Sequence, residues 1–166
     1  LAACGPRGPK KGQGEKIDFS QTLTKKTEIN VWLDDEGGEY AKALIEAFNA
    51  TEEGKDIAVI HRHEGSVESR ERLKTVGPTG GGPDVFQFPH DHLSSAILED
   101  LVFPLPESTR ELVNQRSHPI GAAIAKVQYD ETTGQYGPGS NAAERLFAMP
   151  TSVESVGLYY NKKCNF

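Results

Sequence analysis

The sequence contains few cysteines, no excess of basic residues and no long apolar run. Its two cysteines, Cys4 and Cys164, lie near opposite ends of the chain, which leaves neither a disulfide framework nor a Cys-x-x-Cys metal site. The 18 Lys and Arg residues are outnumbered by 24 Asp and Glu, giving a formal net charge of −6. This balance disfavours nucleic acid as a partner, because its phosphates bind basic surfaces. No apolar run approaches the length of a membrane span.

Sequence motifs of catalysis are also lacking. The chain contains no P-loop, no Gly-x-Gly-x-x-Gly fingerprint and no Gly-x-Ser-x-Gly nucleophile elbow. These motifs therefore give no indication of a catalytic site, and no cofactor is expected.

The first half of the chain alternates strand-like and helix-like segments. Short apolar runs are typical of buried parallel strands, and apolar residues at helical spacing follow each run. This pattern predicts an α/β fold with a mixed, mainly parallel sheet and flanking helices. The predicted strands are residues 28–35, 56–64 and 84–89, and the predicted helices are residues 38–50, 66–76 (with Ser66 as N-cap) and 92–100.

The second half is less regular. Residues 101–106 contain prolines and are predicted to form an edge or connecting strand. Helical segments interrupted at Pro119 are expected within residues 107–126, and a long polar loop without a core within residues 128–141. Two strand-like runs are expected around Pro150.

The beginning of the chain, LAACG, resembles the lipobox that ends a bacterial lipoprotein signal peptide. This resemblance implies that residues 1–4 are a lipobox remnant and that Cys4 carries the lipid. The alternative is an ordinary apolar beginning with a free thiol. Residues 5–26 are rich in Gly, Pro and Lys without apolar periodicity, which predicts a flexible tether.

Polar and aromatic residues follow the predicted parallel strands. In open α/β sheets ligands bind outside the carboxyl ends of the strands, where the connecting loops gather. The candidates at these places are Asp34, Asp35 and Glu36 after the first strand, Phe88, Asp91 and His92 after the third, and Glu154 after the segment FAMPTSV.

Three segments resemble, in the same order along the chain, the extracellular solute-binding proteins (family 1) of sugar ABC transporters, in particular their maltose/maltodextrin-binding branch. These segments are INVWLDDEGGEYAKALIEAFN, GGPDVFQFPHDHLSSAILEDLVFPL and RLFAMPTSVESVGLYYNKK. The resemblance runs from about residue 28 to residue 163, with one extra loop at 129–144.

The resemblance implies a periplasmic-binding-protein-like (type II) fold, in which a ligand lies between two α/β lobes. Because family members are considerably longer, the chain is interpreted as an N-terminal fragment. Residues 27–112 would form the first lobe, and residues 113–166 the crossing into an incomplete second lobe. The resemblance also implies a binding protein rather than an enzyme, with an oligosaccharide ligand and delivery to the transmembrane subunits of an ABC permease. The protein would be lipid-anchored through Cys4 to the outer face of the cytoplasmic membrane, or periplasmic.

The resemblance also carries over individual site residues. Asp91 matches a carboxylate that contacts ligand hydroxyls, and Glu154 matches the carboxylate of a Pro-x-x-Val-Glu motif. Phe88 stands where the maltose branch has a stacking Trp, His92 stands where it has Arg, and Glu36 aligns with the Asp of an Asp-Lys pair whose Lys is absent here. A carboxylate accepts hydrogen bonds from neighbouring sugar hydroxyls, and an aromatic ring covers the C–H face of a pyranose.

Each of these residues also has a structural interpretation. The acidic residues 34–36 are also consistent with a solvated turn that caps the next helix, and Asp91 with an N-cap. Phe88 is equally consistent with a core position, Trp32 is expected in the core, and Glu154 is also consistent with a surface carboxylate without a role.

Two other classes of function remain open from the residues. A phosphoacceptor receiver domain would use Asp91 as acceptor and the acidic cluster as a Mg²⁺ site, although a fitting strand-borne Lys is missing. A metal-binding lipoprotein would use His61, His63, His90 and His92, because imidazole is a common zinc ligand. No Cys joins these histidines, and no metal is expected.

Overall fold

A computed structural model describes residues 27–139 and 141–154, and all structural statements refer to these residues. The predicted lipobox at residues 1–4, with Cys4, and the predicted tether at residues 5–26 lie outside them. The part of the second strand-like run beyond residue 154 also lies outside them.

The first sheet consists of three parallel strands in the order β2-β1-β3. β1 (Thr27–Leu33) pairs along its whole length with β2 (Ile57–His63), so that Thr27 lies opposite Ile57 and Leu33 opposite His63. The short β3 (Val85–Phe86) pairs with the end of β1. The predicted parallel arrangement is confirmed, and the third strand is shorter than predicted.

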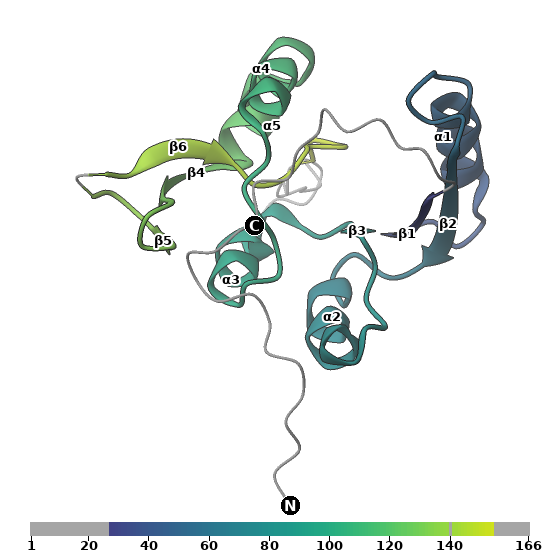
Figure 1. The fold of residues 1–166 in the computed structure, drawn as a ribbon, viewed down its shortest axis with the longest axis horizontal. Helices are drawn as coiled ribbons and strands as arrows, with labels where there is room; N and C mark the ends of the chain where they lie inside the picture. Colours follow the sequence, from purple (N-terminus) through teal and green to yellow (C-terminus); the bar gives the residue numbers. More distant parts are fainter. Residues whose placement is uncertain (1–26, 140, 155–166) are drawn as a thin grey trace, which may run out of the picture.

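Helices α1 (Glu39–Asn49) and α2 (Ser69–Val76) lie on opposite faces of this sheet (Figure 1). Trp32 of β1 is 3% exposed, and the guanidinium carbon of Arg72 in α2 lies 5.8 Å from the centre of its ring. The predicted core position of Trp32 is therefore confirmed.

Ser66 does not cap α2, contrary to the prediction. The helix begins at Ser69, and its N-cap residue Glu68 makes no side-chain capping hydrogen bond. The loop after β2 turns back toward the end of β1, and Ser66 bonds there to Asp34. Ser66 therefore bonds to Asp34, which is distant in sequence, instead of capping the helix that follows it.

The second sheet is antiparallel, in the order β5-β4-β6, and lies beside three helices (Figure 1). Its strands are β4 (Lys126–Asp130), β5 (Gln135–Tyr136) and β6 (Ala143–Leu146), and the helices are α3 (Leu93–Leu98), α4 (Glu107–Arg116) and α5 (Pro119–Ile124). The predicted helical break at Pro119 is confirmed, because Pro119 is the first residue of α5. Within the described residues the parallel and the antiparallel strands thus form two separate sheets.

The prediction of a coreless loop at residues 128–141 is wrong. β4 and β5 form a hairpin in which Tyr129 pairs with Tyr136. The ring of Tyr129 also packs edge-to-face against Phe147, with centroids 5.1 Å apart. The alternation of the apolar residues Val127 and Tyr129 with polar neighbours is typical of a strand.

Residues 101–106 form no strand, contrary to the prediction. Among the described residues, one backbone hydrogen bond joins them to the second sheet. The N–H of Leu105 donates to the carbonyl of Leu146 at 2.7 Å. Of the two runs expected around Pro150, the first contains the end of β6, and residues 151–154 have no regular structure.

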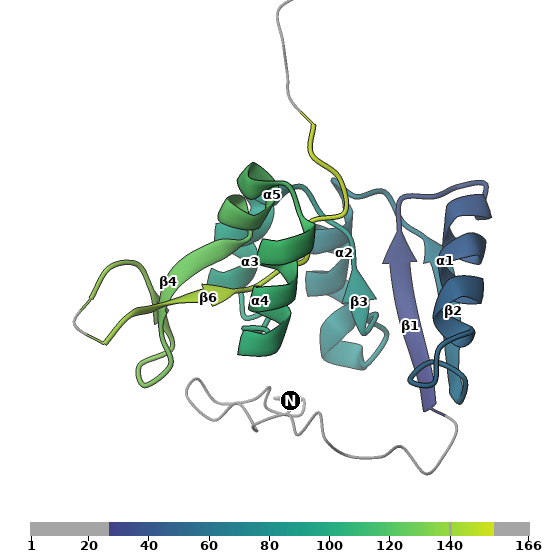
Figure 2. The same cartoon turned by 90° about the horizontal axis from the view of Figure 1, so that it is seen from above.

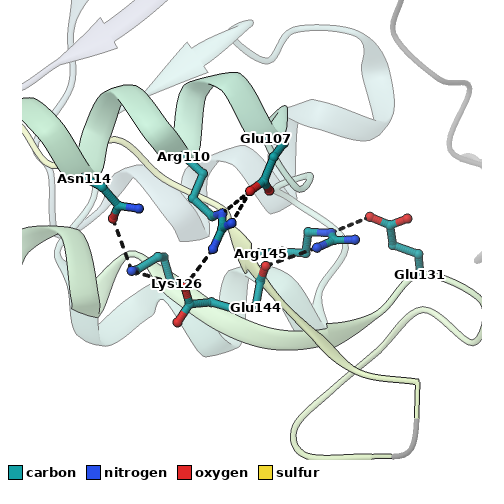
Figure 3. Close-up of polar contacts among 7 residues, drawn as sticks. All are labelled: Glu107, Arg110, Asn114, Lys126, Glu131, Glu144 and Arg145. Atoms are coloured by element: carbon teal, nitrogen blue, oxygen red, sulfur yellow. Dashed lines mark hydrogen bonds and ion pairs between the residues drawn. The ribbon is translucent and has the colours of Figure 1, made fainter.

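A charged network ties α4 to the second sheet (Figure 3). Arg110 binds Glu107 on its own helix and Glu144 of β6, the latter at 3.1 Å. Lys126 of β4 reaches the same Glu144 at 3.2 Å and Asn114 at 3.3 Å. Because these side chains are partly exposed, the network orients α4 more than it stabilises the fold.

None of the helices in the described residues is long and apolar enough to cross a membrane.

Candidate functional site

The carboxyl ends of the parallel strands form one edge of the molecule. In Figure 2 the arrows of β1 and β3 point to this edge, and the segment after β6, drawn in yellow, rises past the level of the strand ends. The predicted site residues after β1 and β3 follow the strands at this edge, as the parallel arrangement requires. We call it the strand-end edge.

Asp34, the first residue after β1, joins the three loops of this edge. Its Oδ2 atom accepts hydrogen bonds from the backbone N–H and the hydroxyl of Ser66, at 3.0 and 2.9 Å. Its own N–H donates to Oε1 of Gln87, which follows β3, at 3.1 Å. The bonds from Ser66, the backbone one foremost, lower the pKa of the Asp34 carboxyl, with a smaller contribution from His63.

Asp35 and Glu36 have different environments. Oδ2 of Asp35 accepts from the N–H of Ala41, the third residue of α1, at 2.8 Å. This bond satisfies one of the free amides at the start of the helix, and Gly38 at the N-cap adopts the left-handed conformation that the tight entry requires. Glu36 is exposed and forms no hydrogen bond or ion pair within residues 27–139 and 141–154.

Phe88 is half-buried and belongs partly to the core. Its ring stacks on Phe86 with centroids 5.0 Å apart and an angle of 28° between the planes. It also packs against the buried cluster of Leu93, Ile97 and Phe147. Phe88 therefore has a structural role, and the half-exposed ring leaves room for a second role at the edge.

Asp91 and His92 lie in a single 3-10 turn, His90–His92, that leads into α3. Asp91 is exposed, and it does not cap α3, whose N-cap residue is His92 and which has no side-chain capping bond. His92 is half-buried, and its Nδ1 atom is buried without a hydrogen-bond partner in the described part of the chain. The capping interpretation of Asp91 is thus wrong, and its carboxylate is available to solvent.

Glu154 lies at the end of the described segment that follows β6. It is exposed, and its Oε1 atom lies 3.5 Å from the hydroxyl of Ser152. A cavity of about 340 Å³ lies beside this segment, between residues 150–153 and the turn from Arg116 to His118. Segment 150–153 approaches α5 closely, since a Cβ added at Gly121 would come within 3.0 Å of Val153.

The chemical character of the strand-end edge is polar and acidic with one aromatic neighbour. Asp91 and Glu36, which follow β3 and β1, present exposed carboxylates, which accept hydrogen bonds and donate none when ionised. Glu154, on the segment after β6, is also exposed. Such acceptors can bind any ligand that carries O–H or N–H donors. The arrangement offers acceptors for hydroxyl donors rather than a nucleophile paired with a base.

The two metal-dependent hypotheses find no support here. Within residues 27–139 and 141–154, no three His, Cys, Asp or Glu side chains are placed to hold a metal ion. This range includes all four histidines of the proposed metal site and the acidic residues of the proposed receiver site. His61 and His63 lie two residues apart on β2, and His90 and His92 lie in a separate turn after β3.

Sequence reasoning did not find the contacts of Asp34. The sequence does not predict a role at this edge for Ser66, Ser69 or Gln87, because hydrogen bonds between separate loops have no local sequence signal. Their positions do give a signal, since each of them follows the end of β2 or β3 by a few residues.

Comparison with known proteins gives one family. The family described as bacterial extracellular solute-binding protein matches residues 34–164. The chain is 28% identical over 162 residues to a galactooligosaccharide-binding protein of Bacillus subtilis (strain 168), covering 98% of this chain and 32% of the relative. It is 27% identical over 108 residues to a maltotriose-binding protein of Pyrococcus abyssi (strain GE5 / Orsay), covering 65% of this chain and 20% of the relative.

A solved structure shares the fold. The maltodextrin-binding protein MalE1 of L. casei BL23, determined without ligand, superimposes with a TM-score of 0.56 and 17% identity over 74% of this chain and 28% of that chain. This likeness confirms the predicted periplasmic-binding-protein-like (type II) α/β fold class. The matched family and relatives are binding proteins and not enzymes, as the sequence predicted. The chain spans about a third or less of their length, 32%, 20% and 28%.

Proposed function

Because this chain belongs to the family of bacterial extracellular solute-binding proteins, we propose that it forms part of the substrate-binding protein of an ABC importer for oligosaccharides. The single observation that carries the proposal is the strand-end edge. There Asp91, three residues after Phe88 in the chain, has an exposed carboxylate that accepts hydrogen bonds from hydroxyl groups, and Phe88 has a partly exposed aromatic ring.

The proposed ligand contacts are Asp35, Glu36, Phe88, Asp91, His92 and Glu154. Asp91 and Glu154 accept from sugar hydroxyls, because both are exposed and neither is held by an ion pair within the described residues. Asp35 already uses Oδ2 for α1, which leaves its Oδ1 for the ligand. His92 is half-buried, and because its Nδ1 atom is buried, its contact to the ligand is made by the exposed part of the ring.

The partner and location follow from the same proposal. A binding protein of an importer hands its ligand to the transmembrane subunits of a permease, so we propose a position outside the cytoplasmic membrane. Lipid attachment at Cys4, which lies outside the described residues, would keep the protein at that membrane. Residues 27–112 are proposed as the first lobe, and residues from 113 onward as the crossing into the second.

The ligand class is tested by isothermal titration of the whole protein as it is encoded. The panel contains maltotriose, longer maltodextrins and galacto-oligosaccharides, the classes named by the relatives, with glucose, acetyl phosphate and Zn²⁺ as non-oligosaccharide controls. We expect saturable binding of at least one oligosaccharide at about micromolar Kd, which corresponds to roughly −8 kcal/mol. Binding of Zn²⁺ or acetyl phosphate without binding of any sugar would contradict the proposal.

A further inference from the structure

The backbone N–H and the backbone carbonyl of Gln87 both form hydrogen bonds. Its N–H donates to the carbonyl of Trp32 in β1 at 3.0 Å. Its carbonyl accepts from the hydroxyl of Ser69 at 2.6 Å. Ser69 is fully buried at the first position of α2, so this hydrogen bond is shielded from solvent. The backbone that leads to Phe88 and Asp91 is therefore fixed from β1 and from α2.

The side chain of Gln87 extends this anchor to a third segment. Its Oε1 atom accepts from the N–H of Asp34, and the carboxylate of Asp34 accepts twice from Ser66. Asp34 thus connects the loop after β1 with the loop after β2 through its side chain and with the segment after β3 through its backbone. These two bonds occupy Oδ2 of Asp34, which indicates that this atom joins loops of the protein.

We propose that Ser66 and Gln87 are positioning residues of the sugar site, which hold Asp34 and hence the loop of Asp35 and Glu36 in a fixed place relative to Phe88 and Asp91. This inference rests on the proposed function. Loops that are ordered before binding lose less conformational freedom when a ligand arrives, and this raises affinity without any new contact to the ligand. Neither Ser66 nor Gln87 needs to touch the sugar.

The test compares Ser66→Ala with Ser66→Thr and with the control Ser108→Ala. Ser108 is an exposed serine of α4 that makes no contact with the three loops. With the tightest sugar of the titration panel, we expect Ser66→Ala to weaken binding about tenfold, the scale of one lost hydrogen bond to a charged group. Ser66→Thr keeps the hydroxyl and is expected to retain affinity, as is Ser108→Ala. The melting temperature is expected to change by less than about 3 °C in all three.

A second variant, Gln87→Ala, is read by amide hydrogen exchange without sugar. Removing Oε1 takes away the acceptor of the Asp34 N–H, so this amide is expected to exchange at least about tenfold faster than in the unchanged protein. Unaltered exchange there, or sugar affinity of Ser66→Ala equal to that of Ser108→Ala, would overturn the positioning role. If the unchanged protein binds no sugar of the panel, the proposed function itself is wrong, so the two failures are distinguishable.

Discussion

Replacing Asp91 with alanine is expected to weaken sugar binding by about 100-fold or more. A carboxylate that accepts from two neighbouring hydroxyls makes two hydrogen bonds to a charged group, each contributing about 1.5–3 kcal/mol, and every 1.4 kcal/mol is about a tenfold change in Kd. Asp91 is exposed and caps no helix. The unfolding midpoint should therefore stay unchanged while the Kd from titration calorimetry rises.

Asp56→Ala is the matched control for Asp91. Asp56 is also an exposed aspartate, but it directly precedes β2 and therefore lies at the amino end of that strand, opposite the strand-end edge. Its replacement is expected to leave the Kd unchanged. An Asp91→Ala protein that bound sugar within about threefold of the unchanged protein would refute the assignment of Asp91 as the main hydroxyl acceptor.

Leu146→Ala is expected to lower the free energy of unfolding by about 2–5 kcal/mol. Leu146 ends β6 with 0% exposure, and it packs with Val113, Ala122 and Ala125 in the core under the second sheet. Truncation there removes apolar contacts and leaves a cavity that close-packed neighbours fill only in part. Denaturant unfolding followed by circular dichroism measures the change.

Leu112→Ala provides the comparison for this core effect. Leu112 belongs to α4, next to Val113, but its side chain is 39% exposed. Its truncation is expected to cost less than that of Leu146, because 39% of Leu112 already faces water. Equal losses for the two variants would contradict the placement of the core around Leu146.

The parallel half of the fold was predictable because its signals are local. Short apolar runs followed by helices with apolar spacing indicated three parallel strands, and Trp32 was expected in the core. The hairpin of β4 and β5 was not predicted, because its short strands lie within a polar, glycine-containing stretch. Its stability comes from packing that sequence alone does not display, such as Tyr129 against Phe147.

The candidate site shows the same division. The positions of Asp34 and Asp91 after strands were predictable from topology, since parallel strands share one carboxyl edge. The partners of Asp34 were not, because Ser66 lies 32 residues away and Gln87 lies 53 residues away along the chain. The capping of α1 by Asp35 agrees with the structural interpretation of the acidic turn, whereas Asp91 proved free of a capping role.

We propose that the strand-end edge is one wall of an oligosaccharide site. A crystal structure of the whole protein with its tightest sugar tests this proposal most directly. We predict sugar hydroxyl oxygens within about 3 Å of the carboxylates of Asp91 and Glu154 and a sugar ring against Phe88. A sugar bound away from this edge, without contact to Asp91, would contradict the account.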